Sequence, residues 1–203
     1  MPHRARHSGP IATDPARRRW MVAAGAAGDI GVAATAVPFV ASMAPSERAR
    51  AGGAPVQVDV ALVLPGKLLT VEWRGKPVWV LHRTPAMLDS LGDHDGLLAD
   101  PRSSREEQQP PYARNAWRSS RPDTGVLIGI CTHLGWVPTY RPDPGAADLG
   151  ASWPGGFYCP CHGSKFDLAG RVFKNVPAPS NLEVPPHRFD GGSVLLVGEG
   201  PVA

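Results

Sequence analysis

The chain is organised around two short stretches, Cys131-Thr132-His133 and Cys159-Pro160-Cys161-His162. Each stretch offers one thiolate and one imidazole from a tight turn. Two sulfur and two nitrogen ligands suit either a zinc ion or a mixed-ligand [2Fe–2S] cluster. Zinc knuckles usually pair like ligands, as C-x₂₋₄-C with H-x₃₋₅-H, whereas here each turn carries one Cys and one His. The split favours a dinuclear site in which two Cys bind one iron and two His bind the other.

Three longer segments around these ligands resemble the Rieske iron–sulfur protein of the ubiquinol–cytochrome c reductase (cytochrome bc) complex. They are CTHLGWVP at 131–138, FYCPCHGSKFDLAGRVF at 157–173 and PAPSNLEVPPHRF at 177–189, in the order of that family. The resemblance runs from the N-terminal Arg cluster nearly to the end of the chain. It implies a Rieske-type [2Fe–2S] cluster in which Cys131 and Cys159 bind the inner iron, and His133 and His162 bind the outer one.

The chain departs from this family at one position that bears on the ligand turns. The family usually has a second Cys five residues after the first ligand, where this chain has Trp136. That Cys normally forms a disulfide with the middle Cys of C-P-C-H, which here is Cys161. Because the chain has 3 Cys and the resemblance assigns two of them as ligands, we expect no disulfide between the turns, with Trp136 filling the vacated space.

The resemblance also assigns roles to residues around the cluster. Ser164 matches a position whose hydroxyl bonds a bridging sulfide, although it could equally stabilise a turn. Phe166 stands where the family often has a Tyr that bonds a ligand thiolate, so we expect a lower potential than in Tyr-containing relatives. Leu134 is expected to shield the cluster from water or to be ordinary core. Pro177-Ala178-Pro179 matches a rigid loop that covers the cluster.

His162 is the strongest candidate for contact with quinol, because its metal-free nitrogen can accept or donate a hydrogen bond according to its protonation state. His133 is expected beside it with a secondary role. The other histidines lack neighbouring ligands, and we predict that they are surface or loop residues: His3, His7, His82, His94 and His187.

Composition limits the classes of protein that the chain can belong to. Its 203 residues allow one ordinary domain with an extension, and 42% apolar residues support a globular core. With 23 Gly and 23 Pro, short strands and turns are favoured over long helices. The net charge of +3 is too small to indicate nucleic-acid binding.

The N-terminal region carries export and membrane signals. Arg17-Arg18-Arg19-Trp20-Met21 fits a twin-arginine pattern ahead of an apolar run at residues 20–43. As a helix, such a run of about 24 residues spans about 36 Å, enough for a hydrocarbon core of about 30 Å. Asp29 lies inside it, and a carboxylate at mid-membrane costs about 2.5–3.5 kcal/mol on insertion scales.

Two interpretations of this run compete. One is a cleaved signal peptide with Ala34-Thr35-Ala36 as its cleavage site. The other is an uncleaved anchor in which Asp29 faces partner helices, and the resemblance favours this anchor. The Arg residues then place the N-terminus in the cytoplasm and the head on the periplasmic side of a bacterial inner membrane. Twin-arginine export carries folded proteins, which suits a cluster inserted before transport.

The remainder predicts an all-β, turn-rich head. Alternation at 56–64 indicates a strand, 67–73 and 77–82 a hairpin, 84–91 a short helix, 126–130 a strand leading to Cys131, and 194–197 a closing strand. The resemblance implies an antiparallel β-sandwich with an inserted cluster-binding subdomain. We expect a cytoplasmic segment at 1–19, an anchor at 20–43, a flexible hinge at 44–55 and a head at 56–203, with the subdomain at about 126–178.

The leading interpretation is an electron-transfer subunit of a quinol-oxidising membrane complex. By resemblance, its partners are quinol, the membrane, cytochrome b and a c-type cytochrome in a dimeric complex, and it binds no nucleic acid. One alternative is the small Rieske subunit of a periplasmic oxidase such as arsenite oxidase, some of which lack the disulfide. The other is a zinc-dependent binding module.

Overall fold

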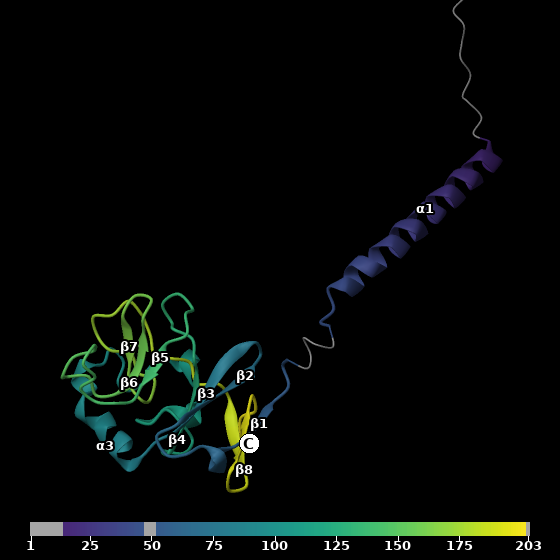
Figure 1. The fold of residues 1–203 in the computed structure, drawn as a ribbon. Coiled ribbons are helices and arrows are strands. Elements are labelled where there is room, and N and C mark those ends of the chain that lie inside the picture. Colours follow the sequence, from purple (N-terminus) through teal and green to yellow (C-terminus); the bar gives the residue numbers. More distant parts are fainter. Residues whose placement is uncertain (1–13, 47–51, 202–203) are drawn as a thin grey trace, which may run out of the picture. The chain divides into compact units, whose positions relative to one another are not determined.

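The computed structural model describes residues 14–46 and 52–201, which divide into an N-terminal unit and a head. Figure 1 shows the N-terminal unit as a single helix, α1, and the head as a set of short strands joined by long loops. Parts of three predicted segments, at 1–13, 47–51 and 202–203, lie outside the described residues.

Helix α1 spans Pro15–Ser42, so it begins five residues before the predicted apolar run and includes the three arginines. Asp14 caps it by accepting the N–H of Ala16 at 2.9 Å, and Pro15 suits the first helical position because no backbone partner is needed there. Within the described chain, α1 is the one helix long and apolar enough to cross a membrane. Its 28 residues span about 42 Å, and all of its side chains are exposed in the isolated chain.

Two antiparallel three-stranded sheets form the base of the head. One has the order β1-β9-β8, and the other has the order β2-β3-β4. Their strands are β1 (Val56–Asp59), β2 (Leu68–Trp73), β3 (Lys76–His82), β4 (Thr124–Ile128), β8 (His187–Asp190) and β9 (Val194–Val197). Between β4 and β8 the chain leaves these sheets to build a third one.

The third sheet has the order β5-β6-β7 and carries the second ligand stretch. Its strands are β5 (Thr139–Arg141), β6 (Gly156–Cys159) and β7 (Ser164–Phe166). Figure 1 shows these three strands close together at one end of the head. The all-β head with an inserted small sheet is therefore confirmed, and every strand pair is antiparallel.

Helical turns fill the long connections. Helix α3 (Pro85–Asp93) is capped by the Thr84 hydroxyl, which accepts the N–H of Met87 at 3.3 Å. Short 3₁₀ turns cover Val60–Leu62, Asp95–Leu97, Glu106–Gln108 and Pro111–Ala113. The predicted short helix and hairpin are thus confirmed, whereas the strand before Cys131 begins two residues earlier than predicted and ends at Ile128.

Two apolar clusters hold the head together. The larger one joins the base to the third sheet, where the Trp79 and Phe157 rings stack at 4.6 Å with an interplanar angle of 13°. A side chain at Gly129 would collide with the Trp79 ring, so glycine lets the chain pass this tryptophan just before the first ligand turn. The smaller cluster lies between the two base sheets and includes Trp73, Val78 and Val126. The ligand-bearing sheet is therefore fixed to the base by aromatic packing.

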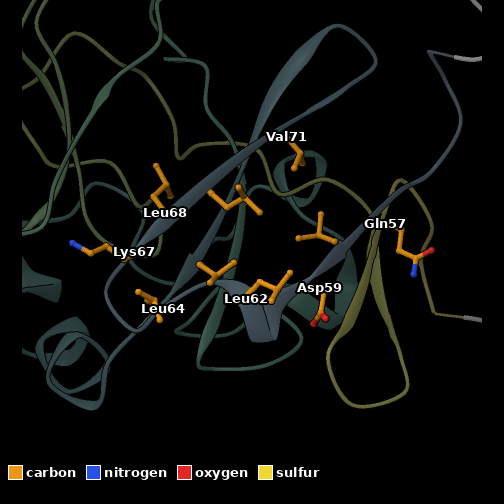
Figure 2. Close-up of a pocket in the computed structure, with 10 residues that line it drawn as sticks. Gln57, Asp59, Leu62, Leu64, Lys67, Leu68 and Val71 are labelled. Carbon is orange, nitrogen blue, oxygen red and sulfur yellow. The ribbon is translucent and has the colours of Figure 1, made fainter.

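A groove of about 500 Å³ opens between β1 and β2, on strands far along the chain from the ligands. Figure 2 shows Leu62, Leu64, Leu68 and Val71 around it, with Gln57, Asp59 and Lys67 at its margins. None of its lining residues belongs to either ligand stretch. The groove therefore contributes nothing to the candidate metal centre.

Candidate metal centre

The first ligand turn, residues 131–136, follows β4 and is closed by its own backbone. The N–H of Cys131 donates to the carbonyl of Trp136 at 2.7 Å, and the N–H of Gly135 donates to the carbonyl of Cys131 at 3.0 Å. Gly135 has φ +82°, a conformation that glycine adopts without steric cost. This closure holds Cys131 and His133 on one compact turn.

The second ligand turn, residues 159–164, joins β6 to β7. Cys159 is the last residue of β6 and pairs with Ser164, the first residue of β7. The N–H of Gly163 donates to the carbonyl of Cys159 at 2.9 Å, and Gly163 has φ +80°. Both ligands of this turn, Cys159 and His162, are therefore anchored at the ends of paired strands.

The structure brings the four predicted ligands together as two pairs. Cys131 and Cys159 are buried, with 3% and 2% of their surface exposed, and their thiols are close enough to affect each other's ionisation. His133 and His162 lie at the surface, with ring centroids 4.9 Å apart and ring planes at 85°. In the described part of the chain, no three His, Cys, Asp or Glu side chains surround one ion position. A buried thiol pair and a separate surface imidazole pair fit two metals better than one.

The surroundings of Cys159 show what a ligating thiolate would need. Burial raises the pKa of the Cys159 thiol, and the neighbouring Cys131 thiol raises it further. Backbone N–H groups of Cys161 and His162 face the sulfur and act in the opposite direction, because they favour the thiolate. A cation bound by both sulfurs would offset the cost of burying two thiolates, so the donor set fits a metal cluster.

A third segment, the proline loop (residues 177–180), connects the two ligand turns. The Thr132 hydroxyl donates to the carbonyl of Ser180 at 2.7 Å. The Ser164 hydroxyl oxygen accepts the N–H of Ala178 at 3.0 Å. One hydrogen bond therefore reaches each ligand turn from the same loop, and the two turns are fixed relative to each other without a covalent link.

The structure agrees with the expectation for Cys161 and disagrees with the one for Trp136. Cys131, Cys159 and Cys161 are all free thiols, as expected for a chain with 3 Cys. The expectation that Trp136 fills the space of the absent disulfide is wrong, because 63% of its surface is exposed. The proline loop, rather than the indole, connects the turns.

A buried charged network supports the chain just after β7. Asp167, fully buried, accepts the N–H groups of Ala169 and Arg171 and the Nε–H of Arg171, all within 2.7–2.9 Å. Burial alone would raise the pKa of this carboxyl, but His94 at 3.4 Å and Arg171 outweigh burial and lower it. The buried Arg83 and Arg118 donate to carbonyls of residues 168–170. The turn that follows the second ligand turn is therefore rigidly held.

Among the five histidines predicted to be surface or loop residues, two are buried: His94, although it lies in a turn, and His187, which lies in a strand. His94, at the end of α3, is 8% exposed and stacks on Phe173 at 5.8 Å. His187, on β8, is fully buried, and its backbone N–H donates to the Tyr112 hydroxyl at 2.7 Å. Each packs against an aromatic ring, which short-range sequence context does not reveal.

The remaining predicted residues lie close to the ligand turns, but their roles toward a cluster stay predictions. Leu134 is 65% exposed, so it borders solvent beside His133 rather than belonging to the core. Phe166 is fully buried opposite Phe157 on the paired strand. Ser164 is fully buried, and with its oxygen occupied by Ala178 its proton is free to point elsewhere.

Sequence reasoning missed the residues that position the ligands rather than bind them. These are Thr132 with Ser180 on the first turn, and Asp167 with Arg171 after the second. A Thr between two ligands and an Asp four residues before an Arg are visible signals. Neither says which distant backbone group the side chain will reach.

The chain is similar to known proteins in sequence and in fold. Residues 107–186 match the family described as Rieske [2Fe-2S] domain, and residues 8–46 match the one described as ubiquitinol-cytochrome C reductase Fe-S subunit TAT signal. The ubiquinol-cytochrome c reductase iron-sulfur subunit of Allochromatium vinosum is 58% identical over 90% of this chain and 88% of its own. The protein of the same name from Bradyrhizobium diazoefficiens is 38% identical over 92% and 97%. A solved chain titled hyperthermophilic respiratory Complex III aligns with a TM-score of 0.47 and 23% identity over 86% of this chain and 98% of that one.

Proposed function

Because the chain belongs to the family of ubiquinol–cytochrome c reductase iron–sulfur subunits, we propose that Cys131, Cys159, His133 and His162 hold its Rieske-type [2Fe–2S] cluster. The chain is an electron-transfer subunit of the cytochrome bc complex and part of a redox enzyme. The division of the ligands into a buried thiol pair and a surface imidazole pair carries the proposal. When bound, a cluster with two imidazole ligands supplies a one-electron acceptor at about −150 to +300 mV, against about −400 mV for plant-type clusters.

His162 is the residue that contacts quinol. Its side chain is exposed, whereas that of His133 is half-buried. The ring nitrogen that does not bind metal accepts a hydrogen bond from the quinol hydroxyl and takes up its proton. The ring centre of His133 lies 4.9 Å from that of His162, and His133 has a secondary role at the same surface. Ser164 then acts as a hydrogen-bond donor toward the cluster, and Leu134, the residue after His133, acts as an apolar shield.

The partners follow from membership of the complex. Helix α1 anchors the chain in the membrane, and the twin-arginine signal matches that of the family. The finer assignments are proposals: a bacterial inner membrane with the head on the periplasmic side, a cytochrome b subunit that binds quinol, a c-type cytochrome that takes the electron, and a dimeric complex. The domain limits are also proposals: 1–19, 20–43, 44–55 and 56–203, with a cluster-binding subdomain at about 126–178.

A redox titration of the cluster on membranes, with and without a quinol-site inhibitor, tests the role of His162. We expect the inhibitor to shift both the midpoint potential and the EPR line shape, because it bonds the exposed imidazole only when the head is docked. Unchanged values with a saturating inhibitor would refute the assignment. Copurification with b- and c-type haem would exclude the periplasmic-oxidase alternative, which the relatives do not favour.

A further inference from the structure

A groove of about 460 Å³ lies beside the second ligand turn. Gly163, the residue after His162, forms part of its wall, and the indole of Trp153 lies against it. Lys165 and Lys174 both line the groove, and none of its lining residues is a carboxylate. Two of the four lysines of the chain, at 67, 76, 165 and 174, therefore gather next to the exposed ligand.

The charge of these lysines is uncompensated. Within the described residues, neither Lys165 nor Lys174 forms an ion pair. Lys174 donates to the carbonyl of Gly96 at 2.7 Å, and the Lys165 ammonium lies 6.0 Å from the centre of the Trp153 ring. These contacts orient the ammonium groups without neutralising them.

The carboxylates next to the groove are engaged elsewhere. Asp95 precedes the lining residue Gly96 and binds Arg171 at 2.8 Å, and Asp148 precedes Leu149 and binds Arg141. The groove therefore presents net positive charge over a partly apolar floor, which favours an anionic partner surface.

We propose that this lysine groove binds a carboxylate-bearing rim of the c-type cytochrome that takes the electron. The inference rests on the proposed function, in which a c-type cytochrome takes the electron from the cluster that His133 and His162 help to hold. An acceptor that approaches His162 must cover the adjoining residue Gly163, and so must also cover the groove. Complementary charge there would orient the acceptor and speed its association. Quinol is neutral, so the same lysines should be indifferent to it.

The test uses the purified full-length chain in detergent, with its cluster reduced by ascorbate and mixed in a stopped-flow instrument with an acidic or a basic c-type cytochrome. For the double variant K165E/K174E we expect the second-order rate constant with the acidic cytochrome to fall at least about tenfold at low ionic strength. The salt dependence of this rate constant should reverse in K165E/K174E. The rate constant of the neutral double variant K165Q/K174Q should lie between those of the unmodified chain and K165E/K174E. With the basic cytochrome, the rate constant of K165E/K174E should exceed that of the unmodified chain.

A matched control, K67E/R102E, makes the same change of charge on two exposed residues that do not line the lysine groove. The midpoint potential of each variant is measured, so that driving force and docking are separated. Equal slowing by both double variants, or no slowing by K165E/K174E, would overturn the docking site. If the unmodified chain reduced neither cytochrome, the proposed function itself would fall, and this inference with it.

Discussion

Replacing Ser164 by Ala tests whether its hydroxyl tunes the metal centre. The oxygen accepts the N–H of Ala178 at 3.0 Å, and both residues are buried. Its own proton is uncommitted and can be donated toward the ligand turn. A hydrogen bond of about 0.5–1.5 kcal/mol that favours the reduced state corresponds to about 20–65 mV, at about 59 mV per 1.4 kcal/mol for one electron. We expect the midpoint potential of S164A to fall by that amount.

Stability must be measured with the potential, because S164A also leaves the buried Ala178 N–H without its acceptor. That loss should cost about 1–3 kcal/mol. The matched control is Thr132→Val, which breaks the other bond to the proline loop. The Thr132 proton is already donated to Ser180, so this variant should lose stability and keep its potential. EPR-monitored redox titration and denaturant unfolding of the full-length chain give the two numbers. An unchanged potential in S164A, or an equal shift in both variants, would refute the reasoning.

Four further outcomes are expected. Phe166→Tyr should raise the midpoint potential by tens of millivolts, because it restores a hydroxyl near the ligand turn; redox titration decides. Anaerobic dithiothreitol should leave the EPR signal of the cluster intact, since Cys161 has no intrachain partner, and loss of the signal would show otherwise. Prolines at 51–54 should slow steady-state turnover severely and leave the potential unchanged, because only the hinge stiffens; wild-type turnover would show that the head need not move. Burial lowers the pKa of His187, so below about pH 6.5 the unfolded chain takes up a proton that the folded head does not. Stability should therefore fall as the pH drops from about 6.5 toward that lowered pKa, and less steeply in His187→Asn, when denaturant midpoints are compared between pH 8 and 5.

Local patterns predicted the elements whose cause is local. The hairpin follows from alternation on both sides of the turn at Arg74-Gly75, and α3 follows from the Thr84-Pro85 cap. The ligands could be predicted in the same way, because each Cys and its His lie within one turn. What spacing could not give is the pairing across turns, since the contact between His133 and His162 depends on how the third sheet packs on the base.

Buried charge was the part of the fold that the sequence concealed. Arg83, Arg118 and Arg171 look like surface residues in isolation, yet each is at most 2% exposed. Their partners are mostly backbone carbonyls and include two carboxylates, those of Asp95 and Asp167, and many of the partners are more than 30 residues away. The periodicity of apolar residues along the chain does not predict such a contact. The same reason explains why the burial of His94 and His187 was not predicted.

The hydrogen bonds from the proline loop to the two ligand turns have a consequence for how the protein matures. A covalent clamp between the turns could close only after exposure to an oxidant, whereas the bonds at Thr132 and Ser164 need none. The turns are therefore held in the same way in a reducing cytoplasm and in an oxidising periplasm. A chain exported in the folded state can therefore have its metal centre assembled before it leaves the compartment where it was made.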